Sequence, residues 1–427
     1  MTQTEAIPAV ALTRSPRGYV PSVAFASFGL FLALLGPTIG GLSVKVQSLV
    51  GLADAPARLG LVTGVGLAFS LVTQPLAGRL SDRSMSRFGR RRPFLLVGVV
   101  GLLLALIGCG VAPNVFLLLV AWCGCQFFGS IAQAAMNATV ADQVPVAKRG
   151  GVSGILGAAT PAGLLIGAVL LNALPNEVLR FVVPGIIAVV LMVVFTGVLK
   201  DHVRTQEPST TLNLRQLLTS FIFDPRKHPD FGWALLSRGL ILVAYGSVST
   251  YLTLFLATSY GMNTQEQLAF NAIAQIIGVG TLIAFSVVGG FVSDRAGRRK
   301  LFIVISGLVI AVGVAGTALS PLFGHSGGLT VLLVAQALTG AGAGCFFAVD
   351  QAMCLSVLPN PDDTAKDLGI LNAAGALPGA LAPLLAGLVF IPLGNALFDG
   401  GYTLWFAVGA AMAIAGSFVV LRIRQVR

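Results

Sequence analysis

Long apolar stretches separated by short polar segments make up nearly the whole chain. Each stretch has about the 20 residues that a helix needs to cross the hydrocarbon core of a bilayer. We therefore predict an all-α membrane protein with twelve transmembrane helices, six in each half. The spans are expected at residues 19–42, 57–80, 93–112, 115–140, 150–173 and 178–199, and then at 231–257, 266–292, 301–320, 329–357, 367–391 and 401–421.

The positive charges are distributed unevenly between the loops. One set of loops holds only Lys45, Arg58 and Arg180, whereas the other set and both tails hold nearly all remaining Lys and Arg residues. Loops rich in these residues stay in the cytoplasm, so both termini are predicted to be cytoplasmic. The first span has no cleavage site after it and is predicted to be a retained helix. The basic loops are 81–92, 141–149, 200–230 and 293–300.

One long polar segment divides the chain into two halves. We predict a cytoplasmic tail at 1–18, a six-helix bundle at 19–199, a cytoplasmic linker at 200–230 and a second six-helix bundle at 231–427. Repeats with corresponding hydropathy are typical of secondary transporters.

Composition excludes several other classes of protein. The chain is 56% hydrophobic and 10% charged, which a soluble domain does not tolerate. Its net charge of +11 lies in membrane-flanking loops rather than in a patch for nucleic acid. The five cysteines fall inside predicted spans without a CxxC pair and are expected to pack rather than bind a metal. No Gly-rich phosphate loop with Lys-Ser or Lys-Thr is present, so we expect neither an enzyme nor a cofactor.

Polar side chains line one face of the fourth predicted span. Gln126, Ser130, Gln133 and Asn137 are spaced 4, 3 and 4 residues apart, which keeps them within about 60° of one another on a helix. Polar groups in lipid usually face a cavity, so Gln126, Gln133 and Asn137 are predicted to bind substrate. Trp122, one turn earlier, either stacks on a sugar ring or, as we favour, anchors the helix at the outer interface.

The second half adds two charges inside predicted spans. Arg238, Tyr245 and Ser249 share a face of the seventh span, and Asp350 lies in the tenth. At about 1.5 Å of rise per residue, both charges lie roughly 10 to 14 Å from the cytoplasmic helix ends. A lone charge at that depth costs about 3 kcal/mol, so we predict an ion pair. If the pair opens, Asp350 is the best proton acceptor; the alternative is a permanent pair that only joins the two helices.

Three further amides are candidates for hydrogen bonds to substrate. Asn271 and Gln275 lie in the eighth predicted span and Asn372 lies in the eleventh. Bonds between helices are the more frequent use of such residues.

One basic loop occurs twice in the chain. The first copy, at 78–92, reads GRLSDRSMSRFGRRR, and the second, at 290–300, reads GFVSDRAGRRK. This loop resembles the signature loop of the major facilitator superfamily. The resemblance implies two six-helix bundles around a central cavity lined by the first, fourth, seventh and tenth helices, with alternating access by rocking. The insertion in the first copy and residues 369–378 resemble the sucrose and proton symporters and related glycoside carriers, although Arg149 is displaced by about two residues from their sugar-binding arginine.

The same loop is predicted to act as a cytoplasmic gate. A glycine permits close helix approach, and arginines from the loop can clasp an acid at a neighbouring helix end; the resemblance supplies Asp142 for this role. Such a latch holds one state closed and breaks in the other. The alternative is that the arginines only set topology. The gate candidates are Gly78, Asp82, Arg83, Arg90, Arg91, Asp142, Arg149, Asp294, Arg295 and Arg298.

The predicted cavity favours proton-coupled symport of a neutral polar solute such as a sugar or glycoside. It contains amides, hydroxyls and one balanced charge pair. The rival function is a drug and proton antiporter, whose Gly-Pro signature residues 157–163 partly match. A third class, a membrane sensor with a carrier fold, is less favoured. We expect a monomer in the inner (plasma) membrane that binds a small-molecule substrate, with the proton as coupling ion.

Overall fold

Helices make up almost all of the described chain. The structure, a computed structural model, describes residues 15–201, 226–357, 364–398 and 400–424, without the side chains of 82, 146, 364–369, 372 and 373. No strand occurs within these ranges. Most of the predicted tail at 1–18 and linker at 200–230 therefore lies outside the described residues. The all-α prediction is confirmed for the part that the structure describes.

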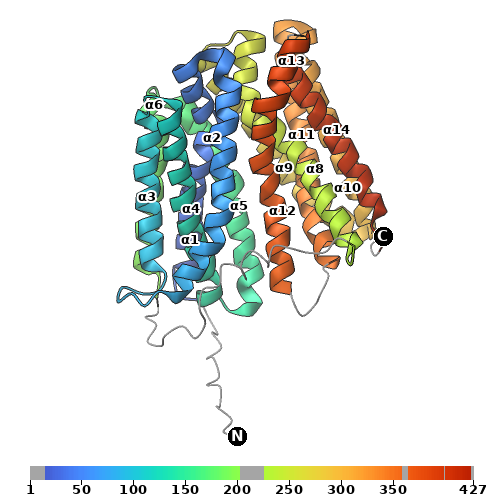
Figure 1. Cartoon of the computed structure of the whole chain (residues 1–427). Coiled ribbons are helices and arrows are strands. Elements are labelled where there is room, and N and C mark those ends of the chain that lie inside the picture. The colour runs from blue at the N-terminus through green and yellow to red at the C-terminus, as the bar shows by residue number, and fades with distance from the viewer. Residues whose placement is uncertain (1–14, 202–225, 358–363, 399, 425–427) are drawn as a thin grey trace.

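The first group of helices belongs to the N-terminal half of the chain (Figure 1). It consists of α1 (Tyr19–Gly36), the π-helical turn η1 (Pro37–Gly41), α2 (Leu42–Arg83), α3 (Arg92–Val111), α4 (Val115–Gln143), α5 (Val146–Ala173) and α6 (Glu177–Val198). Within this group, α4 packs against α2 and α3, and α1 packs against α5 and α6.

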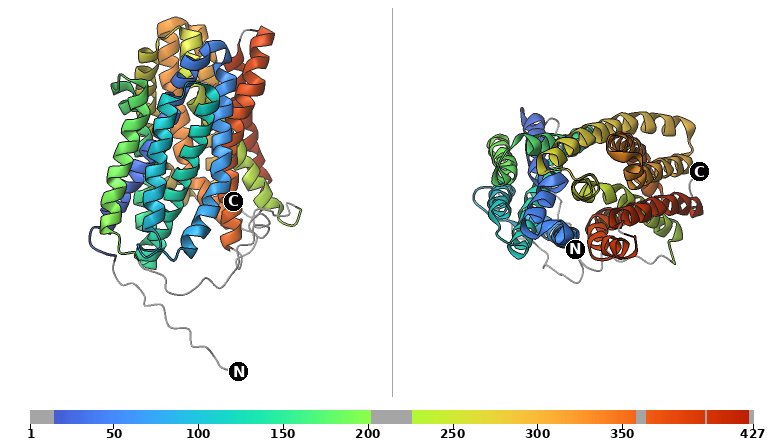
Figure 2. Two further views of the ribbon diagram at one scale, coloured as in Figure 1. Left: turned by 60° about the vertical axis from the view of Figure 1, so that its left-hand side comes forward. Right: turned by 90° about the horizontal axis from the view of Figure 1, so that it is seen from above.

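The second group belongs to the C-terminal half and lies beside the first, as the view along the helices in Figure 2 shows. Helix α11 packs against α9 and α10, and α14 packs against α8 and α10. The elements are α8 (Pro229–Tyr260), α9 (Thr264–Ala296), α10 (Arg299–Leu319), η2 (Ser320–Phe323), α11 (Gly324–Ser356), α12 (Thr364–Leu385), η4 (Ala386–Phe390), α13 (Ile391–Phe398), α14 (Gly401–Val419) and η5 (Val420–Arg422).

The described residues contain 10 helical stretches long and apolar enough to cross a membrane. Two of them, Tyr19–Ser81 and Arg299–Ser356, have 63 and 58 residues, whereas a single crossing needs about 20. The first leaves helical geometry at Gly51, with φ 76° and ψ 176°, and the second is interrupted by η2. The count of twelve spans stays a prediction. Residues 42–56, predicted as a loop, are helical apart from Gly51 because a helix bonds its own backbone groups.

Three helices begin with an asparagine that satisfies free backbone N–H groups. Asn114 accepts a bond from the N–H of Leu117 at the start of α4, and Asn176 accepts one from Val178 at the start of α6. Asn263 forms a capping box with Glu266 at the start of α9. Such caps contribute about 1 kcal/mol each and fix where the helices begin.

Glycines let α11 approach its neighbours on two faces. A Cβ atom at Gly344 would lie 2.1 Å from the carbonyl oxygen of Leu282 on α9. A Cβ atom at Gly342 would lie 2.7 Å from the carbonyl oxygen of Ser306 on α10. These glycines therefore permit close helix packing. Lipid adds no hydrophobic drive between helices, so contact area holds such helices together.

Gly344→Ala is expected to destabilise the protein, because the new methyl group meets backbone of α9 that cannot move away alone. Overpacking of this kind costs about 1 to 3 kcal/mol. The matched control is Gly280→Ala on α9, where a Cβ atom meets nothing within 4 Å. Thermal unfolding of the purified protein should show a lower Tm for the first variant only; equal Tm values for both variants would contradict this packing.

Candidate functional site

The predicted ion pair joins α8 to α11. Nη1 of Arg238 donates to Oδ2 of Asp350 at 2.7 Å. The side chain of Asp350 is 3% exposed and that of Arg238 is 14% exposed. Nη1 also donates to the side-chain oxygen of Gln351 at 3.3 Å, and Sγ of Cys354 lies 3.6 Å from Oδ1 of Asp350. The contact that the matched depths predicted is therefore confirmed.

Helix α12 closes over the arginine of this pair. A Cβ atom at Gly375 would lie 3.2 Å from Nη2 of Arg238, so the guanidinium rests against the backbone of α12. Its Nε is buried without a hydrogen-bond partner among the described residues. The pair thus lies where three helices meet, and a shift of α12 changes the surroundings of the charge.

The other predicted residues of α8 lie further along the helix. The ring of Tyr245 packs edge-on against Phe347, with centroids 5.7 Å apart. Ser249 is exposed. Gln275 is buried on α9, and Asn372 lies on α12 with a side chain outside the described part of the structure.

The polar stripe of α4 divides between two environments. Gln126 and Ser130 are buried, and Gln126 packs beside Gly66 of α2. Gln133 is half-buried and Asn137 is exposed. Spacing on one helix gives a common face, but the neighbouring helix decides how much of that face is open.

Trp122 is fully buried, so its interpretation as an outer-interface anchor is wrong. A Cβ atom at Gly66 would lie 2.4 Å from the indole, which means that the glycine makes room for the ring between α2 and α4. The indole is therefore a packing residue in the core of the N-terminal half.

Asn137 borders a pocket of about 310 Å³ between the C-terminal part of α4 and the N-terminal part of α5. Arg149 lies at the same pocket and donates from Nε to the carbonyl of Val144 at 3.0 Å and from Nη2 to that of Ala141 at 2.8 Å. These bonds tie the guanidinium to the last carbonyls of α4. Arg149, a predicted gate residue, thus bonds backbone carbonyls and forms no ion pair with a described residue.

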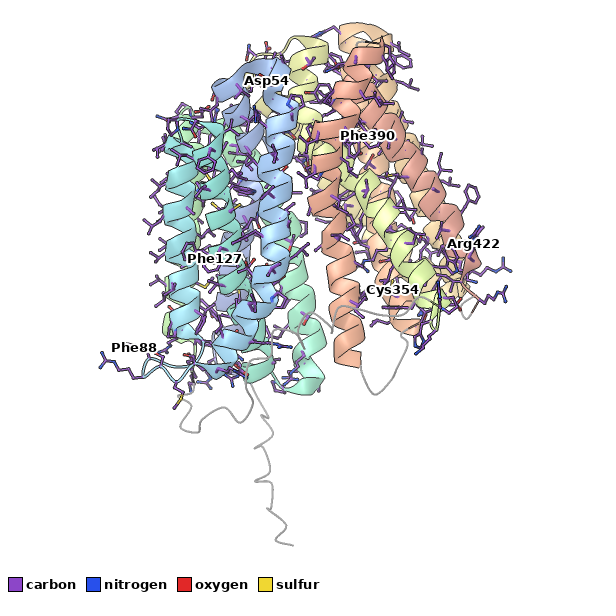
Figure 3. All side chains as sticks on the ribbon, in the orientation of Figure 1. Asp54, Phe88, Phe127, Cys354, Phe390 and Arg422 are labelled. Carbon is purple, nitrogen blue, oxygen red and sulfur yellow. The ribbon has the colours of Figure 1, made fainter. Side chains whose placement is uncertain are left out.

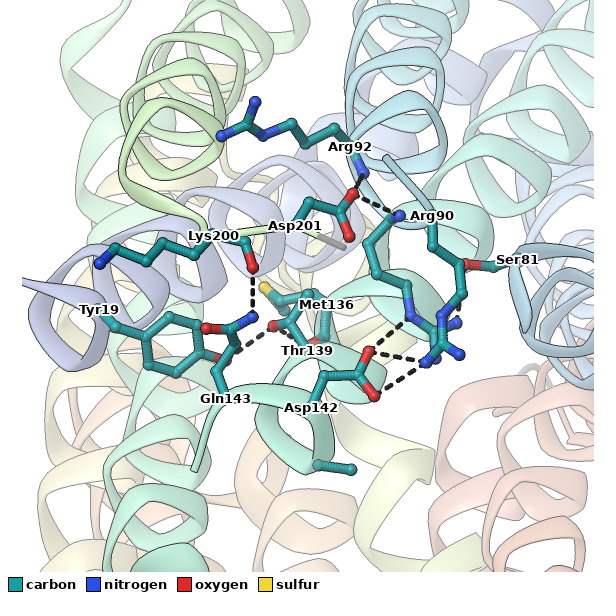
Figure 4. Close-up of polar contacts among 12 residues, drawn as sticks. Tyr19, Ser81, Arg90, Arg92, Met136, Thr139, Asp142, Gln143, Lys200 and Asp201 are labelled. Carbon is teal, nitrogen blue, oxygen red and sulfur yellow. Dashed lines mark hydrogen bonds and ion pairs between the residues drawn. The ribbon is translucent and has the colours of Figure 1, made fainter. Parts of the chain in front are cut away.

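Several predicted gate residues do meet in a polar cluster (Figure 4). Asp142, at the end of α4, accepts bonds from Nη2 of Arg90 at 2.9 and 3.0 Å and from Nε of Arg91 at 3.0 Å. Nη1 of Arg91 also donates to Ser81. Asp201 accepts from the backbone N–H groups of Arg91 and of the next residue, at the start of α3. The predicted contact of Asp142 with the loop arginines is confirmed, and it lies within the N-terminal half.

The remaining gate candidates lie in different surroundings. A Cβ atom at Gly78 would meet nothing within 4 Å, so the expected close approach there is wrong for this conformation. Arg83 is half-buried, and the side chain of Asp82 is not described. In the second loop copy Asp294, Arg295 and Arg298 are exposed, and none forms an ion pair with a described residue. The second loop is shorter, since only Gly297 and Arg298 separate α9 from α10.

The two halves bond to each other at the opposite end of the molecule. The hydroxyl of Tyr251 on α8 lies 3.3 Å from the carbonyl of Pro56 on α2, in the other half, and donates at 2.7 Å to the carbonyl of Pro383 on α12, in its own half. Gly60 and Gly387 allow this approach, because a Cβ atom on Gly60 would lie 2.4 Å from the carbonyl of Pro383. Tyr251 therefore joins α8 to both α2 and α12.

A second set of bonds joins η1 to α8 and α9. Nδ2 of Asn271 donates to the carbonyl of Ile39 at 2.6 Å, and Thr253 donates to the same oxygen at 3.2 Å. Gln265 of α9 bonds Asn172 at the end of α5. Sequence reasoning missed Tyr251 and Thr253 as contacts between halves. The available signal was a tyrosine deep in an apolar span, since its buried hydroxyl needs a partner.

Comparison with known families decides what kind of protein this is. The profile of the Major Facilitator Superfamily matches residues 20–285 and 279–427. The chain belongs to the Major Facilitator Superfamily. It is accordingly a transporter of the secondary type rather than an enzyme, and a multi-pass integral protein of the inner membrane that carries a small molecule.

Relatives of this superfamily member differ in what they transport. The chain is 28% identical over 385 residues to "Multidrug resistance protein MdtG" of Proteus mirabilis (strain HI4320), covering 83% of this chain and 87% of the relative. A peptide transporter POT structure has a TM-score of 0.75 and 13% identity over 96% of this chain and 94% of its own. A D-xylose-proton symporter has a TM-score of 0.66 and 18% identity over 96% and 99%. The two structures establish the fold alone, and the sugar branch is not confirmed.

Removing one partner of the ion pair in this superfamily member should cost more stability than removing both. Arg238→Gln leaves the carboxylate of Asp350 buried without its cation, which typically costs about 3 to 5 kcal/mol. The double variant with Asp350→Asn leaves no charge and should regain most of the lost Tm. Arg298→Gln, at an exposed arginine, is the control and should be neutral. A double variant as unstable as Arg238→Gln alone would contradict a direct pair.

Tyr251→Phe should loosen the contact between the halves while keeping the ring. A hydrogen bond contributes about 1 kcal/mol, so the population of the separated state should rise about fivefold. We would measure labelling of Ser249→Cys by a membrane-impermeant thiol reagent from the outside, with the native cysteines replaced. Tyr402→Phe is the matched control, because that hydroxyl bonds no carbonyl of the other half. Equal labelling of all three proteins would refute the role of the Tyr251 hydroxyl.

Proposed function

We propose that the chain works by alternating access, with twelve transmembrane helices in two bundles at 19–199 and 231–427 and both termini in the cytoplasm. Membership of the superfamily supports the bundles. The breaks at Gly51 and η2 support twelve crossings, since each divides a stretch that is long enough for two spans. The uneven distribution of Lys and Arg supports the orientation.

The function that we infer is proton-coupled export of drug-like compounds. The observation that carries it is the similarity to the multidrug resistance protein, which extends over 87% of that relative's length. The alternative that the sequence left open is thereby favoured over sugar symport. The burial of Gln126 and Ser130 against neighbouring helices also weakens the sugar assignment, because a polyhydroxylated solute needs several converging open polar groups.

Asp350 is the group that we propose for proton coupling. It is a buried acid deep in a span, and an acid in that position is a functional candidate by default. Nη1 of Arg238 bonds one carboxylate oxygen of Asp350, so we propose that the two side chains separate before the proton binds. The contact of Arg238 with α12 at Gly375 offers a way to couple that separation to movement of α12.

The contacts between the halves support the proposal that this conformation is closed at the outer end and open at the inner end. The hydrogen bonds between the described parts of the two halves all involve outer helix ends, including the bond of Tyr251 to Pro56 and that of Asn271 to Ile39. At the inner end the cluster of Asp142 with Arg90 and Arg91 stays within one half. We propose that this cluster rigidifies the inner end of the N-terminal half and is exchanged for contacts with the other half when the inner end closes.

Transport by proteoliposomes tests the proposed function. Fluorescent hydrophobic compounds should be moved against their gradient when an opposing proton gradient is imposed. Asp350→Asn should abolish gradient-driven transport yet keep exchange of substrate across the membrane without a gradient, because only the proton step is removed. Asp54→Asn, at an exposed acid on α2 (Figure 3), is the matched control.

Two results would contradict this account of transport. Unchanged proton-driven transport by Asp350→Asn would remove that residue from coupling. Accumulation of radiolabelled sucrose or maltose, without movement of any hydrophobic compound, would favour the sugar symporter over the exporter.

A further inference from the structure

The pocket between α4 and α5 has a chemical character that differs from the ion-pair site. Its polar lining groups are an amide, a hydroxyl and a guanidinium, and its apolar walls come from the same two helices. The lining residues are Asn137, Val140, Ala141, Arg149, Ser153 and Leu156. A volume of about 310 Å³ is at the small end of ligand pockets, which range from about 300 to 1,000 Å³.

Arg149 is held in place but keeps donors free. Two of the five guanidinium N–H groups bond the last carbonyls of α4, and the other three have no partner among the described residues. Two fixed bonds remove most of the side-chain entropy that a ligand would otherwise have to overcome. The arginine is therefore preorganised to receive an acceptor group.

The two other polar groups of the pocket are also available. Asn137 and Ser153 are exposed, and neither side chain bonds another described residue. The nearest acid on α4, Asp142, is already bound by Arg90 and Arg91, so its charge is largely compensated. The charge that the pocket presents is positive.

The pocket is accessible in this conformation. The inner half of α5 is largely exposed, and a Cβ atom at Gly150, Gly154 or Gly157 would meet nothing within 4 Å. Val140 and Leu156 provide apolar surface next to the polar groups. A ligand entering from the inner end thus contacts the positively charged guanidinium of Arg149 and the apolar side chains of Val140 and Leu156.

We propose that this pocket binds the acidic head of an amphiphilic molecule, a carboxylate, sulfonate or phosphate, with its apolar part against Val140 and Leu156. A guanidinium fork pairs with such groups through two parallel bonds. The proposal rests on the proposed export function and deepens it, because it names acidic amphiphiles as a class that the inner-open state admits. Asn137 and Arg149 then act together on one ligand.

Equilibrium binding to the full-length protein in phosphatidylcholine nanodiscs tests the site. The probe is dansylglycine, which carries a carboxylate, and the matched ligand is its neutral amide. Charge-assisted bonds predict at least about tenfold tighter binding of the acid. Arg149→Gln should remove that advantage and leave binding of the amide unchanged. Equal binding of both ligands to the unaltered protein would overturn the proposal.

Control variants separate the pocket from general charge and from folding. Lys148→Gln removes the neighbouring exposed charge and should change binding by less than about twofold, since a solvated charge is screened. Asn137→Ala and Ser153→Ala leave the bonds of Arg149 intact. Each variant should weaken binding of dansylglycine and leave binding of its neutral amide unchanged. If Lys148→Gln and Arg149→Gln weaken binding equally, or if neither alanine variant weakens it, the pocket is not the site.

Two further measurements identify the source of the ligand and distinguish a failure of this proposal from a failure of the proposed export function. In the first measurement, phosphatidylglycerol is added as a competitor of dansylglycine. Competition in the unaltered protein, but not in Arg149→Gln, identifies a lipid head group as the occupant. Lack of competition identifies a soluble acid. Both results support an acidic ligand. Binding needs no proton gradient, so failed transport with intact binding would refute only the export function, and intact transport with no preference for the acid would refute only this pocket.

Discussion

Loss of water as a hydrogen-bond partner governs where the polar groups of this protein lie. A charge in the hydrocarbon region must find a partner within the protein. Asp350 finds Arg238. At the end of the molecule opposite Asp142, Lys45 bonds Glu177 at 3.0 Å and the carbonyl of Gly110 at 3.1 Å. Arg180 donates to the carbonyl of Leu174. The contacts of Lys45 and Arg180 lie within the N-terminal half. The pair of Asp350 and Arg238 rests against α12, which also contacts α2 of the other half.

The two ends of the molecule use different kinds of bond, which suits the alternation between states that we propose. Where the halves bond to each other, neutral side chains such as Tyr251 and Asn271 donate to backbone carbonyls. Each such bond contributes about 1 kcal/mol, so a few of them hold a state without trapping it. At the other end, the charged cluster of Asp142 with Arg90 and Arg91 joins elements of one half only, which supports the proposal that it makes this half rigid. Rigid halves joined by weak contacts favour movement as whole bodies.

Sequence reasoning predicted what depends on local chemistry. Helix lengths follow from bilayer thickness, and the contact of Arg238 with Asp350 follows from matched depth and the cost of an unpaired charge. The contact of Asp142 with Arg90 and Arg91 required the family resemblance. The role of Trp122 was not predictable in the same way, because its burial depends on the absence of a side chain at Gly66 on another helix.

The contacts between the halves were also beyond the sequence. Tyr251 and Asn271 bond carbonyl groups, which every residue has, so no residue type in the partner helix identifies them. The pocket at Arg149 was missed for a related reason. Asn137 was assigned to the substrate and Arg149 to the gate, and only the packing of α4 against α5 brings both to one cavity. Three-dimensional arrangement, rather than composition, decides such sites.

The central claim is that protonation of Asp350 biases the protein between states whose two ends open alternately. Electron spin resonance distances test it directly, with one label pair at inner positions 151 and 356 and another at outer positions 54 and 397, after replacement of the native cysteines. The account predicts that lowering the pH changes the two distances in opposite directions and that Asp350→Asn abolishes the response. Distances that change in the same direction, or a pH response that persists in Asp350→Asn, would contradict it.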